Sequence, residues 1–135
     1  MTAAQDILVK RIYEPADAGD GARFLVDRLW PRGVSKDKAD LTAWLKALSP
    51  SSDLRIQFHE QEAAGGRKAA DEAWSAFRRA YFAELDAGGP DIAAALDQLR
   101  AVKGRVTLLY GARDEERNNA TALLEWLKRD VKNGA

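Results

Sequence analysis

The segment Gly104-Arg-Val-Thr-Leu-Leu-Tyr-Gly111 (GRVTLLYG) decides the fold class of this chain. Between its two glycines, residues 105–110 form a continuous apolar run, which is typical of a strand covered on both faces. Such strands belong to parallel sheets, because the crossover connections between parallel strands place helices over the sheet. The segment therefore predicts an α/β protein with this strand inside a parallel sheet.

Two shorter strands are expected near the start of the chain. Residues 7–13 (ILVKRIY) combine β-branched residues with alternating charge, and residues 23–29 are more apolar. A turn-rich segment with Pro15, Gly19 and Gly21 joins them. From these residues alone, the two strands form either a hairpin or two members of a parallel sheet.

Helical patterns fill most of the remaining chain. Leu41, Trp44, Leu45 and Leu48 follow helical spacing, and Asp40 stands where an N-cap belongs. Residues 30–39 are expected to be a loop, and further helices are predicted after Ser51 or Ser52, over 68–86, from Pro90 to about 103, and from about 115 to 131. The sum is a small, mainly parallel sheet of about three strands covered by helices, in one layered α/β domain over residues 1–135.

Composition excludes several classes of function. The 135 residues carry no net charge, and there is no cysteine and only one histidine, His59. Disulfides, thiolate catalysis, and cysteine-rich or histidine-rich metal sites within one chain are therefore excluded, and no metal is expected. No glycine-rich phosphate loop of familiar spacing occurs, so no nucleotide cofactor is predicted. No signal peptide or apolar run of membrane-spanning length is visible, which predicts a cytoplasmic protein without membrane partners.

Two strand ends carry an unusual load of polar residues. The second strand ends in Asp27, Arg28, Trp30 and Arg32, and the last strand is followed by Arg113, Asp114, Asn118 and Asn119. If the strands are parallel, both segments leave the sheet at its carboxyl edge, which is where open α/β sheets bind ligands. The last helix also begins there, and its free N–H groups favour anions.

These residues predict a site for a phosphate- or carboxylate-bearing small molecule. Arg28, Arg32 and Arg113 are the candidate binding groups, because guanidinium forks match paired oxygens. Asp27 and Asp114 are candidate acid–base groups. The remaining candidate ligand-binding residues are Trp30, Asn118 and Asn119.

Structural roles for the same residues remain open. Asp114 fits an N-cap of the last helix, and Asp27 with Arg28 fits an ion pair that fixes the loop. Trp30 fits a hydrophobic plug over the sheet, and a lone histidine such as His59 is more often exposed or structural than catalytic.

Four segments carry a resemblance to a known family. The segments RFLVDRLWPRGVSK, LTAWLKALSPSSDLRIQF, FRRAYFAEL and GRVTLLYGARDEERNNATALLEWL resemble the YeaO-like branch of the domain of unknown function 488 family, almost end to end. The resemblance implies a small bacterial cytoplasmic α/β protein and does not imply a reaction. A longer branch of that family places a helix between the first two strands, which favours the parallel arrangement here. That branch also carries a cysteine-and-histidine block after its last strand, which this chain lacks.

Three hypotheses of function follow from the sequence. The first is a small-molecule binder or enzyme acting on an anionic ligand. The second is a nucleic-acid-associated or regulatory module that uses the basic loop with Lys36 and Lys38 against phosphates and Trp30 for stacking, although the neutral net charge argues against it. The third is a protein-interaction domain whose charged edge is purely structural. Oligomeric state stays open.

Overall fold

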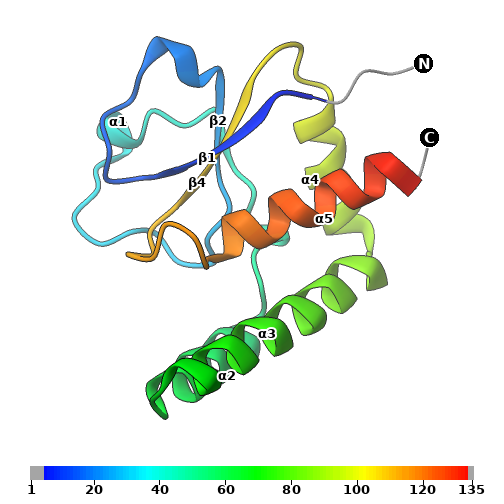
Figure 1. Cartoon of the computed structure of the whole chain (residues 1–135). Helices are drawn as coiled ribbons and strands as arrows, with labels where there is room; N and C mark the ends of the chain where they lie inside the picture. Colours follow the sequence, from blue (N-terminus) through cyan, green and yellow to red (C-terminus); the bar gives the residue numbers. More distant parts are fainter. Residues whose placement is uncertain (1–4, 134–135) are drawn as a thin grey trace.

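Four parallel strands form one sheet in the computed structural model, which describes residues 5–133 and the side chains of residues 5–129. The strands are β1 (Ile7–Arg11), β2 (Ala22–Leu25), β3 (Ala43–Trp44) and β4 (Val106–Tyr110). Their order is β1-β4-β2-β3, and every neighbouring pair is parallel. Figure 1 labels β1, β4 and β2 together with the helices of the chain. The predicted parallel α/β sheet is confirmed, with one strand more than expected. The hairpin alternative is wrong, because β4 lies between β1 and β2.

The last strand occupies the interior position that its sequence predicts. All five residues of β4 are buried, and Leu108 pairs with Val9 of β1 on one side and with Phe24 of β2 on the other. An apolar strand tolerates this position because its backbone groups bond to both neighbours and both of its faces are covered.

The predicted helix over residues 40–48 is wrong. Residues 36–39 form the short helix α1 (Lys36–Ala39), Asp40 ends it in the left-handed conformation at φ 46°, and Ala43–Trp44 pair with β2 as β3. A 3₁₀ turn, η2 (Lys46–Leu48), follows. The apolar residues at positions 41–48 are packed in the core, but from a strand and a turn at the sheet edge and not from a helix. Trp44 packs on one face of the sheet, and Leu45 and Leu48 pack on the other.

The later helices agree closely with their sequence patterns. They are α2 (Ser52–Ala63), α3 (Arg67–Ala87), α4 (Pro90–Arg100) and α5 (Asn119–Asn133). Ser51 caps α2 through its hydroxyl, and Pro90 begins α4 as expected. The sequence predicts the beginning of α5 about four residues too early. Asn118 is its actual cap, since its Oδ1 accepts from Thr121 N at 2.9 Å.

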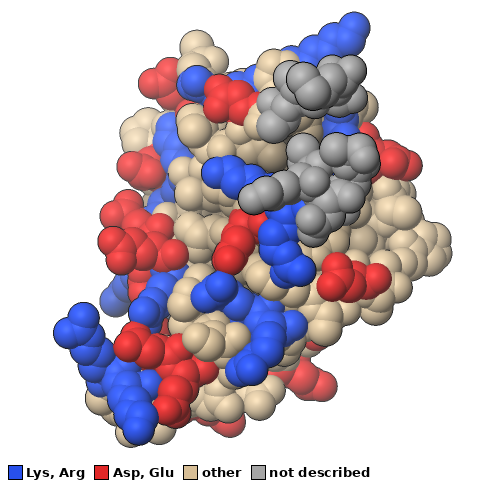
Figure 2. Space-filling view, turned by 45° about the vertical axis from the view of Figure 1, so that its right-hand side comes forward, with Lys and Arg blue, Asp and Glu red and all other residues tan. Residues whose placement is uncertain are grey.

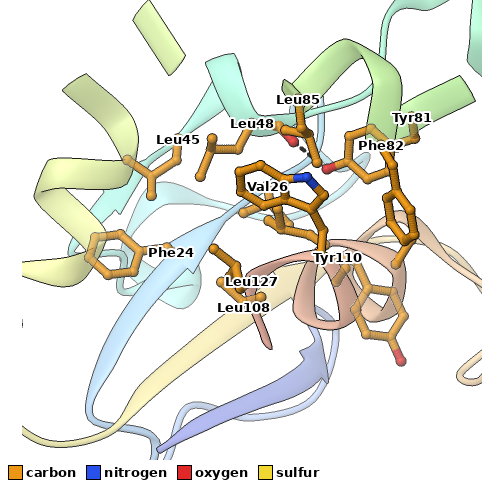
Figure 3. Packing of buried hydrophobic residues seen from close by; sticks show 14 of the residues in the cluster. Phe24, Val26, Leu45, Leu48, Tyr81, Phe82, Leu85, Leu108, Tyr110 and Leu127 are labelled. Atoms are coloured by element: carbon orange, nitrogen blue, oxygen red, sulfur yellow. Dashed lines mark hydrogen bonds between the residues drawn. The ribbon is translucent and has the colours of Figure 1, made fainter. Parts of the chain in front are cut away.

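Two clusters of buried residues cover opposite faces of the sheet. The larger cluster joins side chains of β2 and β4 to those of α3 and α5 (Figure 3), among them Phe24, Leu108, Tyr110, Tyr81, Phe82, Leu85 and Leu127. The smaller cluster contains Leu25 and Leu109, which alternate with Phe24 and Leu108 along their strands and so lie on the other face. The sheet is therefore the middle layer of the molecule.

A buried ion cluster fixes the opposite end of the sheet from the carboxyl edge. The Asp20 carboxylate pairs with Arg23 and with Lys10, the latter at 3.1 Å. Burial alone would raise the pKa of Asp20, but the Asp17 N–H and the two cations outweigh it and lower that pKa. Gly21 follows at φ 68°, and a Cβ there would lie 2.2 Å from the Arg105 carbonyl oxygen. The ion pairs tie the start of β2 to β1, and the close approach of Gly21 to Arg105 brings it against the start of β4.

Within residues 5–133, no helix combines the length and the apolar composition that a membrane span requires.

Candidate functional site

The carboxyl ends of β2 and β4 leave the sheet side by side. Leu25 pairs with Leu109, and Val26 N continues the ladder by donating to the Leu109 carbonyl oxygen at 3.1 Å. The next residue, Asp27, then accepts a hydrogen bond from Gly111 N at 2.9 Å. The two polar segments singled out in the sequence are therefore adjacent at one sheet edge, as the parallel arrangement predicts.

Gly111 makes this approach possible because it has no side chain. A Cβ at this position would lie 3.1 Å from Asp27 Oδ2, closer than ordinary van der Waals contact. The glycine thus allows the carboxylate of Asp27 to lie directly against the backbone of the neighbouring strand.

Asp27 is held on its other side by α5. Asn119 Nδ2 donates to Asp27 Oδ1 at 3.0 Å and to the Val26 carbonyl oxygen at 2.9 Å. Burial raises the pKa of Asp27, although the hydrogen bonds from Asn119 and Gly111 and the charge of Arg55 oppose this rise. The proposed ion pair with Arg28 is absent among the ion pairs of residues 5–129, and amide donors hold the carboxylate instead.

A pocket of about 510 Å³ opens beside Asp27. Of the predicted site residues, the structure brings six to its lining: Asp27, Arg28, Arg113, Asp114, Asn118 and Asn119. Helices α2 and α3 supply the facing wall, with Phe58 and Phe77 as its apolar part. The volume falls within the range of ordinary small-molecule sites.

Two of those six residues serve mainly to shape the loop. Asp114 Oδ1 accepts from the backbone N–H groups of Glu116 and Arg117 at 2.9 and 3.0 Å. Asn118 donates from Nδ2 to the Asp114 carbonyl oxygen and caps α5 through Oδ1. Asp114 therefore caps a turn before the helix, and Asn118 caps the helix itself.

Trp30 and Arg32 lie outside the pocket. Trp30 Nε1 donates to the Val34 carbonyl oxygen at 2.6 Å, and its ring meets Trp44 edge-on at 5.5 Å, in the smaller cluster. Arg32 is exposed, and its carbonyl oxygen accepts from the Tyr13 hydroxyl. Trp30 is thus packed as a plug on the far face of the sheet.

Arg55, Glu62 and Arg117 also line the pocket, and sequence reasoning missed them. Arg55 and Glu62 come from α2, together with His59, which lies exposed at the pocket. Their spacing of four and three residues places them on one helix face, and this was the signal available in the sequence. Arg117 is paired with Asp71 of α3 at 2.7 Å.

The arginines of the pocket differ in how far they are engaged. Arg28 Nε donates to the Pro50 carbonyl oxygen at 3.0 Å, which leaves its terminal nitrogens available. Within residues 5–129, the side chains of Arg55 and Arg113 make no hydrogen bond or ion pair. In the same range, no group of three or more His, Asp or Glu side chains is arranged to hold a metal ion.

Fold and site together define a small parallel α/β protein with a charged pocket at the carboxyl edge of its sheet. A sequence model described as "Inactive DUF488-N3 subclade" matches residues 6–135, so the chain belongs to the DUF488 family.

Relatives of nearly the same length support this membership. The chain is 38% identical over 123 residues to "Uncharacterized protein YeaO" of Escherichia coli (strain K12), which covers 91% of this chain and 97% of that protein. It is 36% identical over 123 residues to "Uncharacterized protein Rv3073c" of Mycobacterium tuberculosis (strain ATCC 25618 / H37Rv), with 90% and 92% covered. No solved structure matches the chain significantly.

Proposed function

We propose that the protein binds a small phosphate- or carboxylate-bearing molecule in the pocket beside Asp27. The observation that carries the proposal is the pair Arg55 and Arg113, which come from different elements, line one pocket, and have no hydrogen-bond or ion-pair partner within residues 5–129. A guanidinium has five donors and no acceptor, so two of them around one cavity favour an anion with several oxygens.

The balance of charge in the pocket supports the same ligand class. Four arginines line it, against three carboxylates, those of Asp27, Glu62 and Asp114. Arg117 is already neutralised by Asp71, but the terminal nitrogens of Arg28 remain available beside Arg55 and Arg113. An anion at this position gains charge-assisted hydrogen bonds in a partly enclosed site, where they are stronger than in open water.

Binding without turnover fits the pocket better than catalysis. The matching family model is described as inactive, and the chain has no cysteine to supply a thiolate. Asp114 Oδ1 is engaged by two backbone N–H groups, and both oxygens of Asp27 accept one hydrogen bond each. Acid–base roles for Asp27 and Asp114 stay predictions.

The nucleic-acid hypothesis gains no support from the surface. The ring of Trp30 packs against Trp44, so it is poorly placed to stack on a base. On the face drawn in Figure 2, Lys and Arg side chains are interspersed with Asp and Glu. A phosphate backbone favours a continuous basic strip instead.

A thermal-shift experiment tests the proposal. The parent protein is screened against inorganic phosphate, pyrophosphate, citrate, phosphorylated metabolites and nucleotides. A ligand at 100 times its Kd stabilises the folded state by about 2.7 kcal/mol, which raises Tm by several degrees. Arg55→Ala and Arg113→Ala should reduce this shift, because each removes donors from the pocket.

Arg32→Ala is the matched control, since it removes the same charge outside the pocket. It should respond to the ligand as the parent does. The proposal fails if no compound in the screen shifts Tm, or if Arg32→Ala loses the shift as fully as Arg113→Ala. A shift by oligonucleotides alone, falling steeply with salt, would support the nucleic-acid hypothesis in its place.

A further inference from the structure

We infer that the ligand of this pocket carries hydroxyl groups as well as its anionic group, as a polyol phosphate or a hydroxy acid does. The inference rests on the proposed function and concerns the other end of the same ligand. It comes from hydrogen-bond acceptors at Asp27 and Asn119 that the fold leaves unfilled.

The amide of Asn119 is used on one side only. Its Nδ2 donates both hydrogens, one to the Val26 carbonyl oxygen and one to Asp27 Oδ1. This pattern fixes the orientation of the amide, because reversing it would place an oxygen against two acceptors. Within residues 5–129, its Oδ1 accepts no hydrogen bond, although the residue lines the pocket. An amide oxygen has two lone pairs, so this atom is a free acceptor.

The carboxylate of Asp27 is also only partly used. Each of its oxygens accepts one hydrogen bond, from Gly111 N and from Asn119 Nδ2. A carboxylate offers about four acceptor positions, so roughly half of the capacity remains. Asn119 Nδ2 donates to the Asp27 carboxylate, and the free Oδ1 of Asn119 belongs to the same amide group, so this oxygen and the carboxylate lie close together. Together they form a patch of acceptors on the pocket lining.

The pocket is therefore divided by hydrogen-bond character. Arg55 and Arg113 can only donate, whereas the patch at Asp27 and Asn119 can accept further bonds. A simple anion satisfies the arginines and is repelled by Asp27. A ligand with hydroxyl hydrogens beyond its anionic group satisfies both regions at once. Burial has already made the Asp27 carboxylate costly to ionise, and hydroxyl donors would replace the water that it lost.

Hydroxyl groups fit the patch better than an ammonium group does. An ammonium group would gain from the Asp27 carboxylate, but it would lie in a pocket where four arginines outnumber three carboxylates, and the like charges oppose it. A neutral hydroxyl donates to the same acceptors without that repulsion. The volume of about 510 Å³ accommodates molecules from glycerol phosphate to a hexose phosphate.

The test compares ligands that differ only in their hydroxyl groups. Isothermal titration calorimetry on the intact protein measures Kd for glycerol 3-phosphate against propyl phosphate, and for gluconate against hexanoate. Inorganic phosphate and phosphoethanolamine complete the set. We expect at least one hydroxylated member to bind about tenfold or more tightly than its partner, because a plain ligand would cover the acceptors at Asp27 and Asn119 without offering them a donor.

Two variants then test which residues cause the preference for hydroxylated ligands. Asp27→Asn should reduce the ratio between hydroxylated and plain ligand, whereas Arg113→Ala should weaken both members alike. Circular dichroism and thermal melts confirm that each variant is folded. If Asp27→Asn fails to fold, the ratio of Kd values between hydroxylated and plain ligands on the parent protein still tests the hydroxyl inference.

The outcomes separate the two proposals. Equal Kd values within each pair would overturn the hydroxyl inference and leave anion binding intact. Tighter binding of phosphoethanolamine than of glycerol 3-phosphate would also overturn it, in favour of an ammonium group. Absence of binding by every compound, inorganic phosphate included, would overturn the proposed function itself.

Discussion

Asn119 donates a hydrogen bond to Asp27 at 3.0 Å although the two residues are 92 positions apart. The bond joins the first turn of α5 to the segment that follows β2, and the same amide group also binds the Val26 carbonyl oxygen. The lining of the candidate pocket is therefore also a tertiary contact of the fold. Ligand binding and stability depend on the same pair of side chains.

Asn119→Ala should lower stability and raise the pKa of Asp27 further. The variant removes the donor that favours the ionised carboxylate and leaves the Val26 carbonyl oxygen without that donor. We expect a loss of about 1–3 kcal/mol in urea unfolding. Carboxyl-carbon NMR titration measures the pKa. An unchanged pKa for Asp27 would show that the hydrogen bond is not formed in solution.

Asn118→Ala should remove the cap of α5. Its side chain accepts from Thr121 N at 2.9 Å, and caps of this kind contribute about 1 kcal/mol. Asn118→Ser keeps a capping oxygen and serves as the control, with a smaller loss expected. Equal losses in the two variants would mean that the bond to the Asp114 carbonyl oxygen matters more than the cap.

Gly21→Ala should be strongly destabilising. The residue has φ 68°, and the added methyl group would lie 2.2 Å from the backbone oxygen of Arg105, which cannot move without disturbing β4. We expect a loss of about 2 kcal/mol or more. Gly33→Ala is the control, because its φ is 79° and no atom lies within 4 Å of the added group. That variant should lose only about 1 kcal/mol, from backbone strain alone.

Asp20→Asn should cost about 3–5 kcal/mol near neutral pH, because it leaves Arg23 buried without its counter-charge. The pKa of Asp20 is lowered in the folded protein, so its contribution is present above the pKa of the unfolded chain. It is lost as pH falls through the folded pKa. Urea unfolding of parent and variant between pH 7 and pH 2 should therefore show a difference that shrinks with acid.

A difference that stays constant with pH would contradict the charge-pair explanation. Asp6→Asn provides the control, since Asp6 pairs with Arg105 at an exposed position. That variant should change stability little at any pH, because solvent screens exposed pairs.

Tyr81→Phe should lose more stability than Tyr110→Phe, although both rings are buried. The Tyr81 hydroxyl donates to the Leu48 carbonyl oxygen in the larger core cluster, as Figure 3 shows. Removing it leaves a buried acceptor unpaired, at about 1–2 kcal/mol. Within residues 5–129, the Tyr110 hydroxyl makes no hydrogen bond, and its removal should cost under about 0.5 kcal/mol. Chemical denaturation of both variants measures the difference.

The sequence was sufficient to predict the sheet edge and its polar residues. The apolar run 105–110 identifies an interior strand by local composition, and parallel strands necessarily end at the same edge. That rule places the segments of Asp27 and Asn119 at one edge, but it does not predict the hydrogen bond between them, since the sequence offered Arg28 as the partner of Asp27 instead. The rule also required parallel strands, and the residues alone left the hairpin open.

The segment from Asp40 to Leu48 shows where local patterns fail. Its helical spacing is satisfied by a different arrangement, in which a two-residue strand divides the apolar side chains between the two faces of the sheet. The open edge of β2 decides between the helix and the strand, because its carbonyl oxygens accept hydrogen bonds from the backbone N–H groups of Thr42 and Leu45. The residues next to this segment in the sequence do not indicate that a strand edge lies beside it.

The sequence also does not predict that α2 contributes side chains to the pocket. The helix itself was predicted, but Arg55 joins the site only because α2 and α3 pack as a hairpin across the carboxyl edge. Arg32 fails to join it, although it lies only four residues after Arg28. The direction of the loop after Pro31 and the packing of α2 on α3 both depend on contacts between distant parts of the chain, which local sequence patterns do not indicate.

The position of β4 also has a consequence for synthesis. β1 and β2 are made early, yet each takes its main partner from a strand that begins at Val106. On the ribosome, β1 therefore emerges without a neighbour, and β2 has only the two residues of β3 beside it. Most of the sheet can assemble only after β4 has been made and has inserted between β1 and β2, so until then the strand edges that β4 covers stay unpaired and exposed to other proteins.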